Sequence, residues 1–131
     1  QTQADFLQQN IYDNLSERFI ESFDVVVSLE VIEHFYHPRI LIRQALSALK
    51  TGGILILSTP YHGYMKNLVI SLLGRMDAHH GPLWDHGHIK FFSRSTLATL
   101  VESEGFQVMR WRFAGRVPFL WKSMIVFATP L

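Results

Sequence analysis

Two carboxylates and one imidazole lie within five residues of each other, at Glu30, Glu33 and His34. If this stretch is helical, the spacing i, i+3, i+4 projects all three side chains from one face. Carboxylate oxygens and an imidazole nitrogen can bind a divalent metal ion, and the same groups can transfer protons. A simpler interpretation also stays open, since acidic residues in a first helical turn are favoured by the helix dipole alone.

A second group of polar side chains lies in the segment DAHHGPLWDHGH, residues 77–88. Its glycines and proline indicate an irregular loop. Histidine titrates near neutral pH and is suited to act as a general base, whereas His-x-His with an aspartate can hold a metal ion in a hydrolase. Loop histidines are also commonly just solvated. The candidates are His79, His80, Asp85, His86 and His88, with Trp84 among them.

The elements that must position these groups begin with FDVVVSL, residues 23–29, which reads as a buried parallel strand. Pro38 fits the first turn of a helix with apolar residues at 42, 45, 46 and 49, and Gly52-Gly53 is expected to stop it. A second buried strand follows at 54–58. Strand, helix and strand form a βαβ unit, which places Glu30, Glu33 and His34 at the carboxyl end of a strand, where open α/β sheets bind ligands.

The rest of the chain predicts further helices and a closing hairpin. Residues 6–11 are a weak candidate strand, 65–73 a helix, and Ser93 is expected to cap a helix that buries Leu97, Leu100 and Val101. Residues 106–113 and 123–129 are expected to pair antiparallel. In the first of these strands Arg110 and Arg112 share a face opposite Trp111, as in an edge strand protected by charge. The expected fold is α/β, a mostly parallel sheet ending in an antiparallel hairpin, in one domain over residues 1–131.

Composition narrows the class of protein. The chain has 131 residues, a net charge of +1, 48% apolar residues and no cysteine. It is therefore neither a disordered chain nor a disulfide scaffold, and it has no thiolate zinc site or cysteine nucleophile. Its charge gives no reason to expect nucleic-acid binding, no segment is predicted to span a membrane, and the composition suits a cytoplasmic protein. The N-terminus does not resemble a signal peptide and lacks an initiator Met, so we expect a fragment or a processed form.

Residues 23–60, FDVVVSLEVIEHFYHPRILIRQALSALKTGGILILSTP, resemble the middle of a class I S-adenosylmethionine-dependent methyltransferase. The family's strand "FDvV", its "E-x-x-E-H" turn, its proline, its amphipathic helix, its "LkpGG" and its strand ending "stP" all occur in order. The resemblance continues through HIKFFS at 88–93 and through Gly105-Phe106. Ubiquinone-biosynthesis O-methyltransferases are similar. The resemblance implies a Rossmann-like fold and methyl transfer from S-adenosylmethionine to a small-molecule acceptor.

The resemblance also implies roles for particular positions. Asn10 and Ile11 fall where the family holds adenine, and Ser28, Leu29 and Glu30 fall beside the methionine end of the cofactor. In the ubiquinone-type enzymes the E-x-x-E-H residues hold Mg²⁺ or a similar ion, which implies a site at Glu30, Glu33 and His34. The loop of residues 77–88 corresponds to the cover of the acceptor pocket, where His86 or His88 is a candidate general base, with His34 a third candidate catalytic residue.

One departure from the family is the absence of the Gly-rich cofactor turn, since the eight glycines form no G-x-G-x-x-G. The match therefore begins at the family's third strand, and we expect this chain alone to bind S-adenosylmethionine weakly or not at all. Two alternatives remain, a non-catalytic remnant that binds a partner protein and a small metal-dependent hydrolase. In the family order 3-2-1-4-5-7-6, strand 23–29 becomes an open, apolar edge. We expect residues 1–12 to be detached or re-paired against it, and the chain to self-associate.

Overall fold

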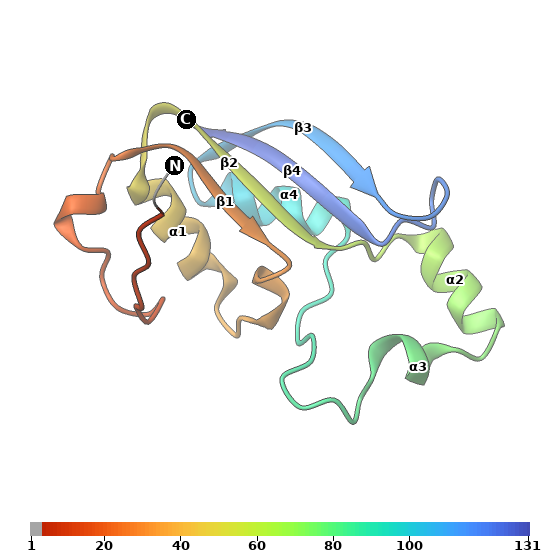
Figure 1. Cartoon of the computed structure of the whole chain (residues 1–131). Helices are drawn as coiled ribbons and strands as arrows, with labels where there is room; N and C mark the ends of the chain where they lie inside the picture. The colour runs from red at the N-terminus through yellow and green to blue at the C-terminus, as the bar shows by residue number, and fades with distance from the viewer. Residues whose placement is uncertain (1–3) are drawn as a thin grey trace.

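A computed structural model describes residues 4–131 and contains a four-stranded mixed sheet (Figure 1). The strands are β1 (Phe23–Leu29), β2 (Leu49–Pro60), β3 (Phe106–Ala114) and β4 (Ser123–Pro130). Their order is β1-β2-β4-β3, in which β1 and β2 are parallel and the other two pairings are antiparallel. The α/β class, the C-terminal hairpin and the predicted order of these strands are confirmed.

Two of the helices cover one face of the sheet. These are α1 (Pro38–Ala48) and α4 (Arg94–Ser103), whereas α2 (Tyr64–Leu72) and α3 (Met76–His80) lead away from the end of β2 (Figure 1). Two short 3-10 helices, η1 (Glu17–Phe19) and η2 (Ile32–His34), flank β1. Within residues 4–131, no helix combines the length and the apolar character needed to cross a bilayer.

The core lies between the covered face of the sheet and these two helices. Alternate residues of β2 and β4 point into it, and α1 and α4 each bury an apolar stripe at helical spacing. The helical periods predicted for both helices are therefore confirmed. Among the fully buried side chains are Ile42, Leu55, Leu57, Leu97, Phe106 and Val126.

The opposite face of the sheet carries a continuous apolar surface that no helix of residues 4–131 covers. Val25 pairs with Ile54, and Ile56 pairs with Phe127, so these side chains share that face. The guanidinium carbon of Arg110 lies 4.2 Å from the centre of the Phe127 ring. Arg110 and Arg112 therefore border this open face from the outer strand, which agrees with the predicted arrangement of charges on an edge strand.

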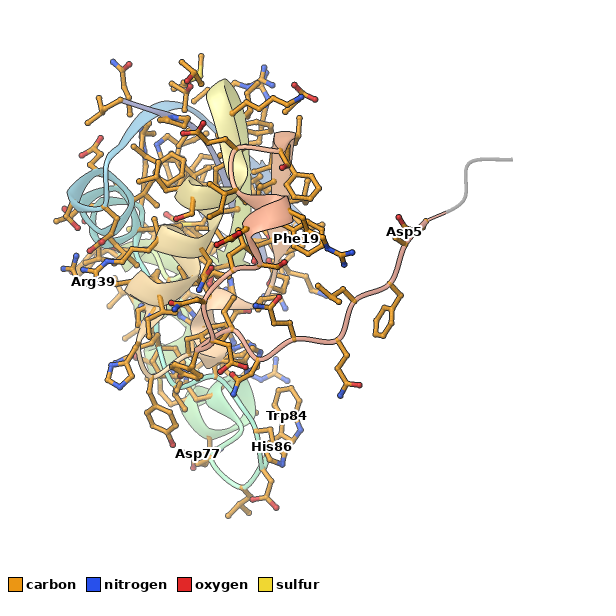
Figure 2. The ribbon with its side chains drawn as sticks, turned by 90° about the vertical axis from the view of Figure 1, so that its left-hand side faces the viewer. Asp5, Phe19, Arg39, Asp77, Trp84 and His86 are labelled. Atoms are coloured by element: carbon orange, nitrogen blue, oxygen red, sulfur yellow. The ribbon has the colours of Figure 1, made fainter. Side chains whose placement is uncertain are left out.

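The N-terminal segment contributes no strand. Residues 4–10 are exposed coil, and Asp5 lies far from the body of the molecule in Figure 2. The prediction of a strand at 6–11 is wrong for this chain, because the segment has no strand beside it to bond its backbone. Residues 4–10 are detached from the sheet, as we expected for residues 1–12 of a chain whose strand 23–29 is an open edge. Residues 1–3 of that prediction lie outside the described residues. β1 itself is paired on one side only.

Two element boundaries differ from the prediction. The helix from Pro38 ends at Ala48 and not at the glycines, because Leu49 already pairs with Phe23 at the start of β2. Gly52 has a φ of +78° within the long strand. The prediction of an irregular loop over residues 77–88 is wrong for residues 77–80, which belong to α3. Gly81 follows this helix in the left-handed conformation that is common at a helix end.

Replacing Ser93 with alanine is expected to lower the free energy of unfolding by about 1 kcal/mol. Its hydroxyl accepts a hydrogen bond from the backbone N–H of Thr96, and the Thr96 hydroxyl accepts one from the backbone N–H of Ser93. Urea unfolding of both proteins measures the difference. Ser16→Ala is the matched control, because Ser16 precedes η1 without any side-chain capping bond. Equal losses in the two variants would contradict a capping role.

Candidate functional site

The site is built where β1 ends beside β2. Glu30 follows the strand with a φ of +54°, an uncommon conformation for a residue other than glycine. Its backbone N–H donates to the Ser58 carbonyl and hydroxyl oxygens, each at 3.1 Å. The Ser58 hydroxyl in turn donates to Glu30 Oε1 at 2.7 Å. These bonds fix the sharp turn and hold the Glu30 carboxylate against the end of β2.

Glu33 is the buried acid of the site. The chain forms the 3-10 turn η2 here, and the buried Ile32 anchors this turn in the core. Glu33 Oε2 accepts a hydrogen bond from the Thr59 hydroxyl at 3.0 Å, whereas its Oε1 is buried without a hydrogen-bond partner. Burial raises the pKa of Glu33, and its backbone and Thr59 hydrogen bonds oppose that shift. A buried, half-satisfied carboxylate at the end of a strand is a functional-site candidate.

Two imidazoles approach the unpartnered oxygen of Glu33. His34 Nε2 lies 4.0 Å from Glu33 Oε1, and His88 Nε2 lies 3.9 Å from the same atom. The Glu33 carbonyl accepts the backbone N–H groups of Ile89 and Lys90, which anchors the segment that carries His88. Candidate ligand atoms of Glu33, His34 and His88 all lie within 4.8 Å of one another.

The loop that carries His86 and Gly87 determines which ring nitrogen of His34 bears the hydrogen. Its Nδ1 lies 3.1 Å from the His86 carbonyl oxygen and 3.2 Å from that of Gly87. Carbonyl oxygens only accept, so Nδ1 carries the proton and donates it. In the neutral ring Nε2 then presents its lone pair toward Glu33, as histidine ligands of metals commonly do.

The structure thus brings together part of each predicted cluster. Glu33 and His34 lie side by side, and His88 from the second cluster joins them. Glu30 is at the same end of β1, but its carboxylate is hydrogen-bonded to Ser58. The prediction that Glu30, Glu33 and His34 share one helical face is wrong, because the Glu30 backbone is left-handed and η2 starts only at Ile32. The His86 side chain is exposed, and its contribution to the cluster is its carbonyl group.

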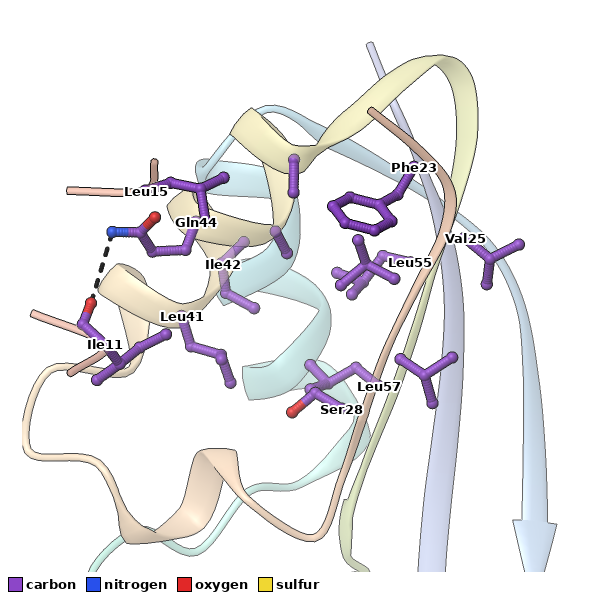
Figure 3. A pocket seen from close by; sticks show the side chains of 14 residues that line it. Ile11, Leu15, Phe23, Val25, Ser28, Leu41, Ile42, Gln44, Leu55 and Leu57 are labelled. Carbon is purple, nitrogen blue, oxygen red and sulfur yellow. Dashed lines mark hydrogen bonds between the residues drawn. The ribbon is translucent and has the colours of Figure 1, made fainter. Parts of the chain in front are cut away.

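Two of the five residues expected near the cofactor line an apolar pocket of about 400 Å³. Ile11 and Ser28 line this pocket between β1 and α1, and the Ile11 carbonyl accepts a 3.5 Å hydrogen bond from Gln44 (Figure 3). The Asn10 side-chain oxygen accepts the N–H of Tyr12 in a local turn. Leu29 is exposed on the edge strand.

Sequence reasoning missed a third group, centred on His62. His62 lies two residues after the end of β2 and is buried with both ring nitrogens unpartnered. Its ring centre lies 5.7 Å from that of His79, 5.9 Å from that of His80 and 5.0 Å from that of Phe91. The signal that could have found it is its position at the carboxyl end of a buried strand. The predicted histidine loop is therefore divided between this cluster and the Glu33 site.

The pH dependence of stability should report on His62. Burial, followed by the charge of Lys66, lowers the pKa of His62 from 6.5 to about 4. The unfolded chain then binds a proton more readily than the folded one, so stability is lost as pH falls from 6.5 toward 4. We expect a decrease of up to about 1.4 kcal/mol per pH unit from this group, measured by urea unfolding across that range.

His62→Gln should flatten this dependence. The matched control is His37→Gln, which changes an exposed histidine. If the two variants had the same pH profile as the unsubstituted protein, the assignment to His62 would be wrong.

With this geometry in hand, comparison with known proteins identifies the fold's relatives. The model of a family described as "Methyltransferase domain" matches residues 2–110. The chain belongs to this family. The resemblance to class I S-adenosylmethionine-dependent methyltransferases is therefore confirmed, and the match covers β1, β2, the Glu33 site and the histidine loop of this methyltransferase domain.

Curated relatives are ubiquinone biosynthesis O-methyltransferases. The protein from Idiomarina loihiensis is 30% identical over 99 residues, covering 72% of this chain and 39% of the relative. The mitochondrial protein from Homo sapiens is 29% identical over 96 residues, covering 73% of this chain and 26% of the relative. The chain thus spans well under half the length of these relatives.

Solved structures share the fold at lower identity. Magnesium protoporphyrin IX methyltransferase from Synechocystis PCC 6803 with bound SAH has a TM-score of 0.64 at 16% identity, over 96% of this chain and 51% of that one. An O-methyltransferase family protein from Burkholderia thailandensis has a TM-score of 0.66 at 20% identity, over 96% of this chain and 35% of that one. These matches extend through the C-terminal hairpin, beyond the family match.

Proposed function

We propose that this methyltransferase domain contributes the acceptor side of an enzyme that methylates a small molecule with S-adenosylmethionine. The observation that carries the proposal is the buried Glu33 carboxylate, with one free oxygen facing His34 and His88, at the carboxyl end of the parallel strands. The O-methyltransferase names of the curated relatives support an oxygen as the methylated atom.

The residues present suit a divalent cation at this point. Glu33 Oε1 is a buried acceptor without a donor, and His34 Nε2 offers a lone pair toward it. One carboxylate and two imidazoles are an appropriate ligand set for a first-row transition-metal ion, and Mg²⁺ would need further oxygen ligands. We propose Glu33, His34 and His88 as the ligands, with Glu30 beside them. A bound cation would lower the pKa of an acceptor hydroxyl and hold its oxygen.

Proton removal from the acceptor is the task of the histidines. A neutral imidazole can accept a hydroxyl proton when it lies within hydrogen-bond reach. When no cation is bound at its Nε2, His88 is the best-placed base, because its side chain makes no hydrogen bond within residues 4–131. It lines an open pocket of about 590 Å³ with His34, Tyr36, Trp84 and His86. Trp84 and Tyr36 offer aromatic surfaces to a flat acceptor. Trp84 and His86 lie near each other on the loop in Figure 2.

The described residues offer a surface for one side of the cofactor. The apolar pocket beside Ser28 and Ile11 provides a wall for an adenine ring, while the carboxylate-bearing Glu30 lies at the end of the same strand. When bound, S-adenosylmethionine supplies an electrophilic methyl group. We propose that Asn10, Ile11, Ser28, Leu29 and Glu30 form this side of its site.

Methyl transfer is tested by incubating the intact protein with S-adenosylmethionine labelled in its methyl group and a panel of hydroxylated aromatic compounds. Label recovered in an O-methylated small molecule is the expected result. Label recovered only in protein or nucleic acid would overturn the small-molecule proposal. No transfer to any acceptor, with folded protein and bound cofactor, would favour the non-catalytic alternative.

Addition of Mn²⁺ is expected to broaden the NMR resonances of the His34 and His88 rings selectively, since a paramagnetic ion relaxes nearby protons. The exposed His37 ring is the internal control, and His88→Gln should weaken Mn²⁺ binding by about tenfold or more. Equal broadening of all three rings would contradict a site at Glu33.

A further inference from the structure

A buried lysine without a carboxylate partner lies beyond the proposed methyl-transfer site. Lys66, on α2, is 4% exposed, and its ammonium group donates to the Tyr61 carbonyl oxygen at 2.7 Å. An ammonium group has three N–H donors, so this one bond leaves two for other partners. The ion pairs of residues 4–131 join other groups and do not include Lys66. Buried charges are normally paired, which makes this one exceptional.

Lys66 lines a groove with other basic groups. The groove has a volume of about 300 Å³ and is walled by α2, α3 and the loop between β3 and β4. Arg75, His79 and Arg116 line it with Lys66, and no acidic residue does. Arg75 and Arg116 are also absent from the ion pairs of residues 4–131. The remaining walls are apolar, formed by Val69, Ile70, Leu73, Ala78 and Leu120.

The charges in this groove act on one another. Burial, followed by the nearby charge of Arg116, lowers the pKa of Lys66. Burial, followed by the charge of Lys66, likewise lowers the pKa of His79. Glu30 opposes the shift at Lys66, but its carboxylate is already bonded to Ser58. An anion placed between these groups would relieve their mutual repulsion.

We propose that this groove binds a phosphate group carried by a ligand. Two guanidinium groups can each donate two parallel hydrogen bonds to a phosphate, and the lysine adds a point charge at the buried end. A phosphate monoester carries close to two negative charges at neutral pH, which matches three cations better than a single carboxylate does. The apolar walls contact whatever carbon skeleton bears the phosphate. This site shares no residue with the Glu33 cluster and does not depend on methyl transfer.

The phosphate can belong to a soluble metabolite or to a lipid headgroup, and two arms of one experiment separate these sources. In the first, calorimetry measures binding of glycerol 3-phosphate to the 131-residue chain, with acetate at equal ionic strength for comparison. In the second, sedimentation measures binding to phosphatidylglycerol vesicles. We expect binding in at least one arm, and none to acetate. The arm that responds identifies the source.

Three variants locate the site. Lys66→Met and Arg116→Gln are each expected to weaken binding at least tenfold, while Arg112→Gln, which removes an equal charge from the open face, should change it less than twofold. Arg116 and Arg112 are exposed, so neither change should affect folding. Lys66→Met removes an unpaired buried charge, and its thermal midpoint should be unchanged or higher. Chemical-shift changes of the His79 ring on binding place the ligand in the groove.

Two outcomes would overturn the proposal. One is the absence of binding in both arms. The other is equal weakening by Arg116→Gln and Arg112→Gln, which would mean attraction to net positive charge without a defined site.

Discussion

Glu33→Gln is expected to reduce methyl transfer by the intact protein by about 10² to 10⁴-fold, the range typical of a lost acid–base or ligand group. The amide keeps the shape of the side chain and can still accept from Thr59 at the oxygen that the hydroxyl contacts. It removes the negative charge at Oε1, toward which His34 and His88 point. Initial rates with a saturating acceptor measure the loss.

Stability provides the control for this variant. Burial raises the pKa of Glu33, so the folded state favours the protonated acid and loses stability as pH rises above the ordinary glutamate range. At pH 7 the amide lacks this cost, and the free energy of unfolding of Glu33→Gln should equal or exceed that of the unsubstituted protein. A folded variant that retains full activity would refute a functional role for Glu33, and an unfolded variant would contradict the expected stability. Glu102→Gln, on an exposed part of α4, should leave activity unchanged.

The double variant Val25→Lys, Val27→Lys is expected to turn a self-associating chain into a monomer. β1 is an outer strand of the sheet, and these side chains are 46% and 55% exposed. An apolar outer strand with free backbone donors and acceptors favours pairing with a second chain, and lysines prevent this by repulsion and solvation. Light scattering over a range of concentrations measures the change, which should move the midpoint of association at least tenfold.

Leu72→Lys is the control for the open strand, since Leu72 is an exposed residue of α2. Helix α2 lies far from β1 in Figure 1. It should leave the association midpoint unchanged. If the unsubstituted chain were already monomeric at high concentration, or if all three lysines had equal effects, association through β1 would be rejected.

The sheet and its helices were predictable because their periodicity is local. Val25 to Val27 and Leu55 to Leu57 are continuous apolar runs, and Leu97, Leu100 and Val101 repeat at helical spacing. The end of α1 was not predictable in this way, because Leu49 fits both the helical period and the start of a strand. Its pairing with Phe23, more than twenty residues earlier, decides in favour of the strand.

The candidate site likewise contains a part that is local in sequence and a part that depends on distant residues. Glu33 and His34 are neighbours in sequence, and they remain neighbours in space. His88 reaches them through bonds between the Glu33 carbonyl and the backbone of residues 89 and 90, a contact that no local pattern encodes. The left-handed turn at Glu30 likewise depends on Ser58, which belongs to another strand. His62 and Lys66 are buried because α2 and α3 pack around them. Histidine and lysine are residue types that are seldom fully buried, so their sequence alone would not predict this.

The position of β4 between β2 and β3 governs the order in which this chain can fold as it is made. During synthesis β1, α1 and β2 emerge before the other strands and can form their parallel unit. β3 emerges next, but its partner in the sheet, β4, is made last. Until β4 has left the ribosome, β2 presents a bare edge and β3 has no partner in the sheet. Pairing of β2 with β4 spans about seventy residues, the kind of distant contact that slows folding. A ribosome that pauses before β4 therefore exposes a half-sheet to chaperones or to wrong pairing.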